Sequence, residues 1–253
     1  AQQALLDLSV PPKEPESPAR PKGPLAAILR RLDALGRAVA GLGASAKGML
    51  GFFGQFLVVT GKNLVRPWKI PWTSLVYHMG ETGVQAIAIV ALLSALIGMV
   101  LAYMSSSQLA MFSMQLFVVK LLEVGVLREM AVLITAILVA GRSGSSFTAQ
   151  IGSMKANEEV AAMRSMGIDP METLVLPRIL ALVLMLPVLT LVADVAGMLG
   201  GMCAVWFSLD ITPRMFFDAL QQGFSLSNFM VGMFKAPFFA VVIGCVGCFC
   251  GFQ

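Results

Sequence analysis

Charged residues interrupt two stretches of this chain that are otherwise apolar: Lys120, Glu123, Arg128 and Glu129 in one, and Lys235 in the other. A charge in hydrocarbon requires a partner, water or a ligand. Arg128 and Glu129 are adjacent, so on an α-helix their side chains point about 100° apart and each needs its own partner. An arginine in this setting suits phosphate. We therefore predict a headgroup cavity lined by Arg128, Glu129 and Lys235. The alternative is a structural network that pairs Glu123 or Glu129 with Lys120 or Lys235.

The remaining reactive side chains form no catalytic or metal-binding pattern. Asp194 is isolated among apolar residues, and we expect it to have a structural partner rather than a substrate role. His78 is the only histidine, which is too little for a catalytic set. Cys245, Cys248 and Cys250 lie in an apolar stretch, as small buried hydrophobes do, so we predict no metal site. These observations favour a protein without covalent chemistry of its own.

A polar segment, residues 141–170, separates two long apolar stretches. We predict a polar helix over about 144–167, ended by Gly167 in a left-handed conformation, with Asp169 capping the next helix. Its charged residues, Lys155, Glu158, Glu159 and Arg164, are available for contacts outside the membrane. The segment begins GRSGSS, which lacks the lysine and hydroxyl of a nucleotide phosphate-binding loop. If ATP drives this protein, another subunit must hydrolyse it.

Composition places the chain in a membrane. Of its 253 residues, 57% are hydrophobic and 13% are charged, whereas a soluble domain has about 25% charged residues. The fold class predicted is therefore an all-α polytopic membrane protein. Its four visible transmembrane helices are expected at about residues 82–103, 119–140, 176–205 and 229–249, and a short helix begun by Thr212 and Pro213 should connect the last two.

The region before the spans divides into two parts. Residues 1–23 are a proline-rich linker, and residues 24–79 are predicted to form amphipathic interfacial, or elbow, helices ahead of the membrane domain at 80–253. The apolar part between Lys47 and Lys62 falls short of the ~20 residues that a span needs. A re-entrant segment or a true span is the alternative. Trp68 and Trp72 are expected at the level of the lipid headgroups.

The distribution of basic residues predicts the orientation. Lys and Arg concentrate before Gly80 and between residues 141 and 178, whereas the two opposite loops contain only Arg214. By the positive-inside rule, the N-terminus and the polar segment lie in the cytoplasm. Gly197, Gly200 and Gly201 on the third span provide a small-residue surface for close helix packing, within one chain or between two.

The polar segment and its flanks resemble a known family. The stretch AGRSGSSFTAQIGSMKANEEVAAMRSMGIDP, between VLREMAVLITAILV and VLPRILALVLMLP, resembles the MlaE-type (YrbE-like) permeases. These are membrane subunits of ABC transporters that work with MCE proteins to move lipids across Gram-negative envelopes. The resemblance covers about residues 78–253. The family has one more charged loop and span at the C-terminal end.

The resemblance implies roles for particular residues. The polar segment corresponds to the coupling helix that docks into the ATPase, with Lys155, Glu158, Glu159 and Arg164 as docking charges. The LREM and FKAP segments, which contain Arg128, Glu129 and Lys235, match family segments at a lipid-facing cavity. Gln150 departs from the glutamate of many relatives, which puts in doubt any contact made by that charge.

The function implied is that of a permease subunit without its own ATPase site. It would move phospholipid or a related lipid between the bacterial inner membrane and a periplasmic MCE-domain protein, for outer-membrane lipid homeostasis. Its partners would be a cytoplasmic ABC ATPase, the MCE protein, membrane lipids and a second copy of itself, with no cofactor and no nucleic acid. Two alternatives remain: an ion-coupled secondary transporter that uses Glu123, Glu129 and Asp194, or a membrane scaffold that anchors an MCE complex.

Overall fold

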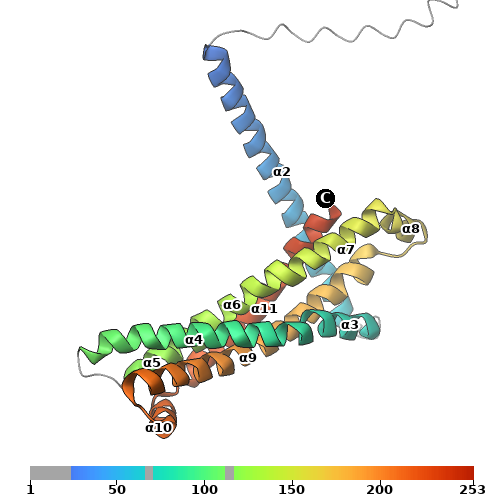
Figure 1. Cartoon of the computed structure of the whole chain (residues 1–253). Coiled ribbons are helices and arrows are strands. Elements are labelled where there is room, and N and C mark those ends of the chain that lie inside the picture. The colour runs from blue at the N-terminus through green and yellow to red at the C-terminus, as the bar shows by residue number, and fades with distance from the viewer. Residues whose placement is uncertain (1–23, 66–70, 112–116) are drawn as a thin grey trace, which may run out of the picture. The chain divides into compact units, whose positions relative to one another are not determined.

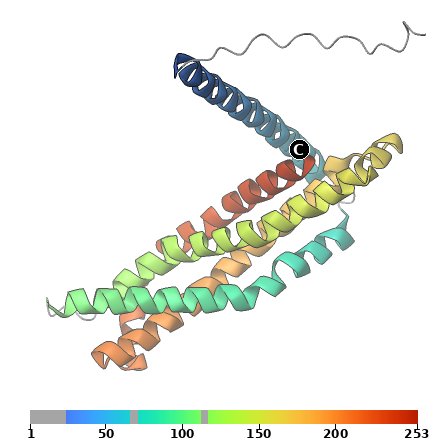
Figure 2. The ribbon, with the colours of Figure 1, turned by 45° about the horizontal axis from the view of Figure 1, so that its top comes forward.

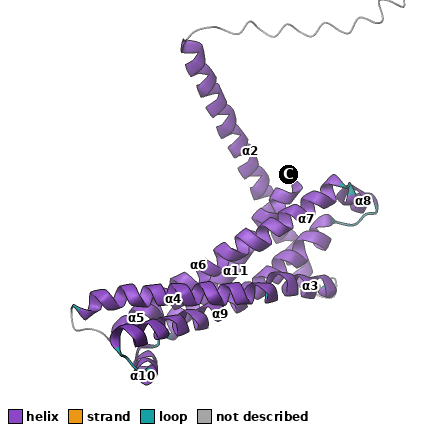
Figure 3. Ribbon diagram, viewed as in Figure 1, coloured by secondary structure: helices purple, strands orange, loops and turns teal. Residues whose placement is uncertain are grey.

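The structure, a computed structural model, describes residues 24–65, 71–111 and 117–253. Its regular elements in these ranges are all helices, as Figure 3 shows. Five helical runs there are long and apolar enough to cross a membrane: Leu32–Asn63, Trp72–Leu109, Phe117–Ala156, Met171–Leu209 and Leu226–Phe252. The predicted all-α polytopic class is confirmed, and the chain is a multi-pass membrane protein. The predicted linker at 1–23 and the predicted interfacial Trp68 lie outside the described residues.

The N-terminal helix α2 (Pro24–Val65) differs from the prediction of separate elbow helices. It is continuous, and Leu32–Asn63 has the length and hydropathy of a span, which agrees with the alternative of a true span. The prediction treated Lys47 and Lys62 as the ends of a short apolar segment. A lysine can, however, lie within a membrane helix and extend its ammonium group to the interface.

The chain divides into two compact units, residues 1–48 and residues 49–253. In the described part of the first unit, Leu32, Leu35 and Val39 are exposed. Arg37 pairs with Asp33 one turn away, at 2.8 Å between Nη2 and Oδ2. This unit therefore presents apolar side chains outward, as a helix that meets lipid or another protein does.

The second unit begins with the rest of α2 and then α3 (Trp72–Thr82), a 3-10 turn (Val84–Ala86) and α4 (Ile87–Ala110). The first predicted span is therefore part of a longer run. After it come α5 (Phe117–Leu122), η4 (Glu123–Met130), α6 (Ala131–Val139), η5 (Ala140–Gly144) and α7 (Ser145–Ala156).

The run from α5 to α7 is one unbroken helix of 40 residues. At 1.5 Å per residue it is about 60 Å long, roughly twice the hydrocarbon thickness of a bilayer, so part of it must project from the membrane. Two of its segments, η4 and η5, are π-helical, a distortion often found at functional sites. The glycines and serines of residues 141–146 do not interrupt the run, since these residues stay helical.

The polar helix predicted over 144–167 is divided in two. Asn157 ends α7, Glu158 adopts a left-handed conformation with φ of 60°, and α8 (Glu159–Ser165) follows. The predicted ends are confirmed: Gly167 has φ of +77°, and the Asp169 carboxylate accepts a hydrogen bond of 2.9 Å from the Met171 amide. The prediction missed the break because Glu158 is not a residue that usually takes positive φ.

The last elements are η6 (Met171–Val175), α9 (Leu176–Leu209), α10 (Pro213–Gly223) and α11 (Leu226–Phe252). Pro213 begins α10 as predicted, although the Thr212 side chain makes no capping bond. Figures 1 and 2 show α4, α9, the α5–α7 run and α11 extending lengthwise through this unit, with α8 near one end and α10 near the other. Residues brought to these two ends are therefore separated by the length of the spans.

Glycines allow α4 and α9 to pack closely. A Cβ atom added at Gly98 would meet the Gly197 carbonyl, and one added at Gly200 would meet the Ala95 carbonyl. Gly201 faces Leu122 instead. The predicted small-residue surface thus serves contacts within one chain, and the backbones of these two helices approach closely at the glycines.

Candidate functional site

A first charged cluster lies at the α10 end and is fully satisfied. Glu123 in η4 is buried, with none of its surface exposed. Its carboxylate pairs with the Lys120 ammonium and accepts hydrogen bonds from the Ser225 amide at 2.8 Å and the Asn228 side chain at 3.4 Å. Lys120 also donates to the Gly223 carbonyl. The cluster therefore holds the α10–α11 connection against the α5–η4 helix.

A second cluster lies about two turns further along the same helix. The Lys235 ammonium of α11 is 2.8 Å from each carboxylate oxygen of Glu129 and 3.4 Å from the Arg128 carbonyl. Arg128 Nε is 3.4 Å from a Glu129 oxygen. The three side chains remain 48%, 44% and 35% exposed for Arg128, Glu129 and Lys235. This cluster is therefore paired internally but open to a ligand.

An apolar cavity of about 370 Å³ adjoins this second cluster. Glu129 and Lys235 line it together with apolar side chains of α6 and α11, which are Val132, Leu133, Phe238, Phe239 and Val242. Such a lining combines one charged edge with apolar walls. It has the character of a site for an amphipathic molecule.

The structure brings together the three residues predicted to line a cavity, with one correction. Arg128 and Glu129 were expected to point too far apart to neutralise each other, yet they make an ionic contact. The directions of two adjacent Cα–Cβ bonds did not decide this contact, because both side chains are long and flexible enough to bend toward each other. The network alternative is also realised, since Glu123 pairs with Lys120 and Glu129 with Lys235.

Asp194 does not have the structural partner that was expected. It is 4% exposed, and both its carboxylate oxygens lack a hydrogen-bond partner among the described residues. It borders a second cavity of about 370 Å³ between α9, α10 and α11, whose walls are otherwise apolar and include Phe216 and Phe229. The sequence contains several charged residues on other spans that could have paired with Asp194. Their positions in the fold exclude them as partners, and the sequence does not give those positions.

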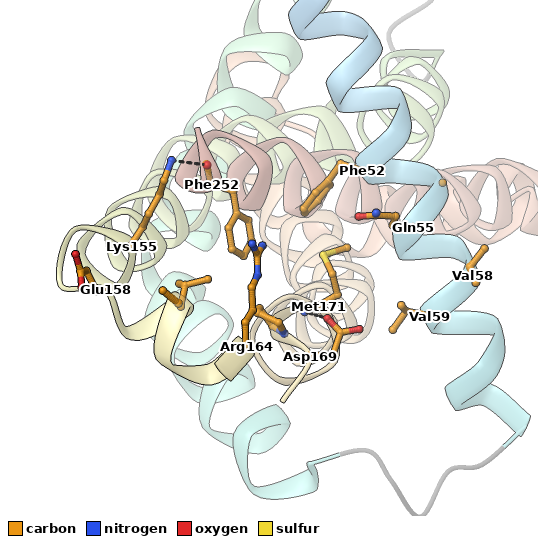
Figure 4. A pocket seen from close by; sticks show the side chains of 14 residues that line it. Phe52, Gln55, Val58, Val59, Lys155, Glu158, Arg164, Asp169, Met171 and Phe252 are labelled. Carbon is orange, nitrogen blue, oxygen red and sulfur yellow. Dashed lines mark hydrogen bonds between the residues drawn. The ribbon is translucent and has the colours of Figure 1, made fainter. Parts of the chain in front are cut away.

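The predicted coupling residues lie at the other end of the unit, around a cavity of about 1140 Å³ that is lined from α2, α7, α8, η6 and α11. Lys155 already has partners: its ammonium donates to the carbonyls of Phe252 at 2.8 Å and Gln253 at 2.7 Å. Figure 4 shows this side chain turned toward the end of α11. Lys155 therefore joins α7 to α11.

The other three predicted coupling residues are exposed in the connection after α7 and in α8, residues 157–165, which we name the α7–α8 turn. Glu158 and Arg164 line the cavity with apolar residues such as Phe52 and Met171 (Figure 4). Glu159 contacts the Asn157 amide at 3.5 Å. Charged side chains held on a short projecting helix provide a surface that another protein can recognise.

A further polar cluster was not predicted as a site. Gln150 of α7 donates to the Glu81 carboxylate of α3 at 3.2 Å and accepts from the Arg178 guanidinium of α9 at 3.1 Å. Arg178 is only 4% exposed and lies 5.7 Å from the Phe147 ring centroid. A sequence signal existed, because Arg178 is a charged residue near the start of the predicted third span, 176–205, but nothing in the sequence indicated its partners.

Comparison with known proteins places this arrangement in a family. The profile of the family described as "Permease MlaE" matches residues 75–253. The chain belongs to the MlaE permease family. The match begins in α3 and includes both charged clusters, the α7–α8 turn and the Glu81–Gln150–Arg178 contacts.

Named relatives extend the comparison. The chain is 33% identical over 227 residues to the "Intermembrane phospholipid transport system permease protein MlaE" of Haemophilus influenzae, covering 89% of this chain and 85% of that protein. It is 32% identical to a "Probable ABC transporter permease protein" of Synechocystis, covering 68% and 65%, and 27% identical to one of Rickettsia typhi, covering 80% and 78%. The family resemblance inferred from the sequence is therefore confirmed.

Proposed function

We propose that this protein is the membrane subunit of an ABC transporter that moves phospholipid or a related lipid between the bacterial inner membrane and a periplasmic MCE protein, for outer-membrane lipid homeostasis. One observation carries the proposal: the half-exposed Arg128–Glu129–Lys235 cluster adjoins an apolar cavity. The cluster provides charge for a headgroup, and the cavity provides apolar walls for acyl chains. The H. influenzae relative is named for phospholipid transport.

Within the cluster, Arg128 is the residue best placed to bind phosphate. The Lys235 ammonium already donates hydrogen bonds to Glu129 and to the Arg128 carbonyl. The Arg128 guanidinium has five N–H donors, and among the described residues it makes only the 3.4 Å contact with Glu129. Donors therefore remain for a two-point interaction with a phosphate group. Glu129 and Lys235 act as the pair that keeps Arg128 in place.

The α7–α8 turn is the proposed docking element for a cytoplasmic ATPase. Its exposed Glu158 and Glu159, together with Arg164, supply charge for recognition, while Lys155 secures the turn to α11. The excess of basic residues before Gly80 supports a cytoplasmic N-terminus and a cytoplasmic turn, with α10 on the periplasmic side. We further propose that two copies of the chain form the translocation unit and that the ATPase supplies all ATP hydrolysis.

An ion-coupled secondary transporter has less support. Such a mechanism needs carboxylates that can exchange a proton or an ion. Glu123 and Glu129 are each held by a lysine, which leaves Asp194 as the remaining candidate of the three. A scaffold without transport activity would not require a charged cluster at the edge of a cavity.

The proposal is tested by reversing charges on the α7–α8 turn. The double variant Glu158→Lys/Glu159→Lys should lose association with the ATPase while remaining folded. A matched control is Asp210→Lys/Asp218→Lys at the α10 end, which also reverses two exposed carboxylates, one of them at a left-handed position. Co-purification measures association, and ATP hydrolysis is measured with and without phosphatidylethanolamine and phosphatidylglycerol vesicles.

Loss of association in the first variant alone supports the docking assignment. If both variants bind the ATPase as wild type does, Glu158 and Glu159 are not part of the interface. If the wild-type protein binds no ATPase and moves lipid without ATP, the ABC assignment itself is wrong.

A further inference from the structure

Three helices that are distant in sequence are joined by one hydrogen-bonded bridge. Gln150 Nε2 lies 3.2 Å from Glu81 Oε1, and Gln150 Oε1 lies 3.1 Å from Arg178 Nη2. The other Glu81 oxygen is 3.7 Å from His78 Nδ1. The bridge thus connects α3, α7 and α9 through the single side chain of Gln150.

The Gln150 amide is suited to this position because it both donates and accepts. A glutamate there could accept from Arg178, but it could not donate to Glu81 unless protonated. An aliphatic residue could do neither. Positions 81 and 150 therefore need one carboxylate and one amide between them. With the amide at 81 and the carboxylate at 150, Arg178 would still donate to position 150, and the amide at 81 would donate to the carboxylate at 150.

Arg178 depends on this bridge. The residue is 4% exposed, and its Nε and Nη1 atoms have no hydrogen-bond partner among the described residues. Its remaining described contacts are Gln150 and the face of Phe147. A buried guanidinium with few partners is held strongly by those that it has, because losing one leaves charge uncompensated. A displacement of Gln150 therefore changes the one hydrogen bond that the described residues provide to the Arg178 guanidinium.

The bridge lies on the path between the docking turn and the spans. Gln150 belongs to the same helix as Lys155, and Glu158 lies in the break that follows the end of this helix. On the other side, α9 is packed closely against α4 through Gly98, Gly197 and Gly200. A displacement of the α7–α8 turn can therefore reach the α4–α9 pair through Gln150 and Arg178.

We propose that Gln150 is a positioning residue that transmits movement of the α7–α8 turn to α3 and α9, and so couples ATP hydrolysis in a partner to lipid movement. This inference rests on the proposed function. It assigns to Gln150 a mechanical role separate from docking, because the side chain lies on the membrane side of the exposed turn. Its removal should uncouple the transporter without releasing the ATPase.

The test measures lipid moved per ATP hydrolysed in vesicles that contain the permease with its ATPase and MCE partner. Gln150→Glu places two carboxylates against each other and should lower this ratio about fivefold or more, with ATPase association unchanged. Glu81→Gln/Gln150→Glu exchanges the amide and the carboxylate and should restore the ratio. Ser146→Ala is the control: it removes only the 3.3 Å contact between Ser146 and Gln150 and should behave like wild type.

Gln150→Asn covers the case in which Gln150→Glu does not fold. It keeps an amide that is too short to reach both partners, so its ratio should also fall. A wild-type ratio in Gln150→Asn or Gln150→Glu, or a double variant that stays uncoupled although folded, would overturn the inference. Failure of the wild-type protein to bind the ATPase would instead overturn the proposed function, so the two failures are distinguishable.

Discussion

The glutamates of two lysine–glutamate pairs lie six residues apart on one helix, yet they have different surroundings. Glu123 is fully buried and has donors from Lys120, Ser225 and Asn228. Glu129 is 44% exposed, pairs with Lys235 and borders a cavity. The same residue types can thus fasten a loop in one place and leave a ligand site in the other. Burial and the number of partners distinguish the two roles.

The largest effect is expected from Glu123→Ala. Removing a buried carboxylate leaves Lys120, Ser225 and Asn228 without their acceptor, and breaking a buried ion pair costs about 3–5 kcal/mol. Unfolding in mixed micelles of increasing SDS content should show this loss. A variant as stable as wild type would mean that the pair is not a structural fastener.

A smaller loss is expected from Lys120→Met. Glu123 keeps its bonds from the Ser225 amide and Asn228, so the cost should be about 1–3 kcal/mol, as for one lost partner of a buried polar group. The same unfolding measurement applies. If this variant is less stable than Glu123→Ala, the carboxylate is not the centre of the cluster.

In the partly exposed cluster of Arg128, Glu129 and Lys235, the substitution Arg128→Gln should reduce lipid transfer rather than stability. Loss of a charge-assisted contact to phosphate should reduce lipid transfer about tenfold, equivalent to about 1.4 kcal/mol, with the unfolding transition unchanged. Transfer of labelled phospholipid to the MCE protein measures the effect. Arg214→Gln, a loss of the same charge in α10, is the control, and an equal decrease in both variants would deny Arg128 a specific role.

Only a small stability effect is expected from Glu129→Gln. The pair with Lys235 is partly exposed, and exposed pairs contribute about 0–1 kcal/mol. Unfolding should therefore change little, while lipid transfer falls because Arg128 and Lys235 lose their shared partner. A stability loss as large as that of Glu123→Ala would remove the distinction between the two pairs.

Much of the candidate site was predictable from the sequence because charges in apolar stretches are conspicuous. Arg128, Glu129 and Lys235 were selected on that ground, and the structure brings them together. The Glu81–Gln150–Arg178 bridge was missed, since Glu81 and Arg178 lie near the ends of predicted spans and Gln150 lies within the predicted polar helix, where polar residues are ordinary. The partner of Asp194 was expected and is not found among the described residues. Roles in lipid binding and coupling stay predictions.

The sequence by itself determined the membrane class, the family and a few helix ends, because hydropathy, glycine and proline act locally along the chain. It misjudged α2 and the polar helix, where lysines within a helix and a left-handed glutamate depart from average behaviour. Only the tertiary structure decided which charges meet. Lys120 and Lys235 could each have paired with either glutamate, and the choice depends on how α11 and the α10–α11 connection pack against one helix, which no local pattern encodes.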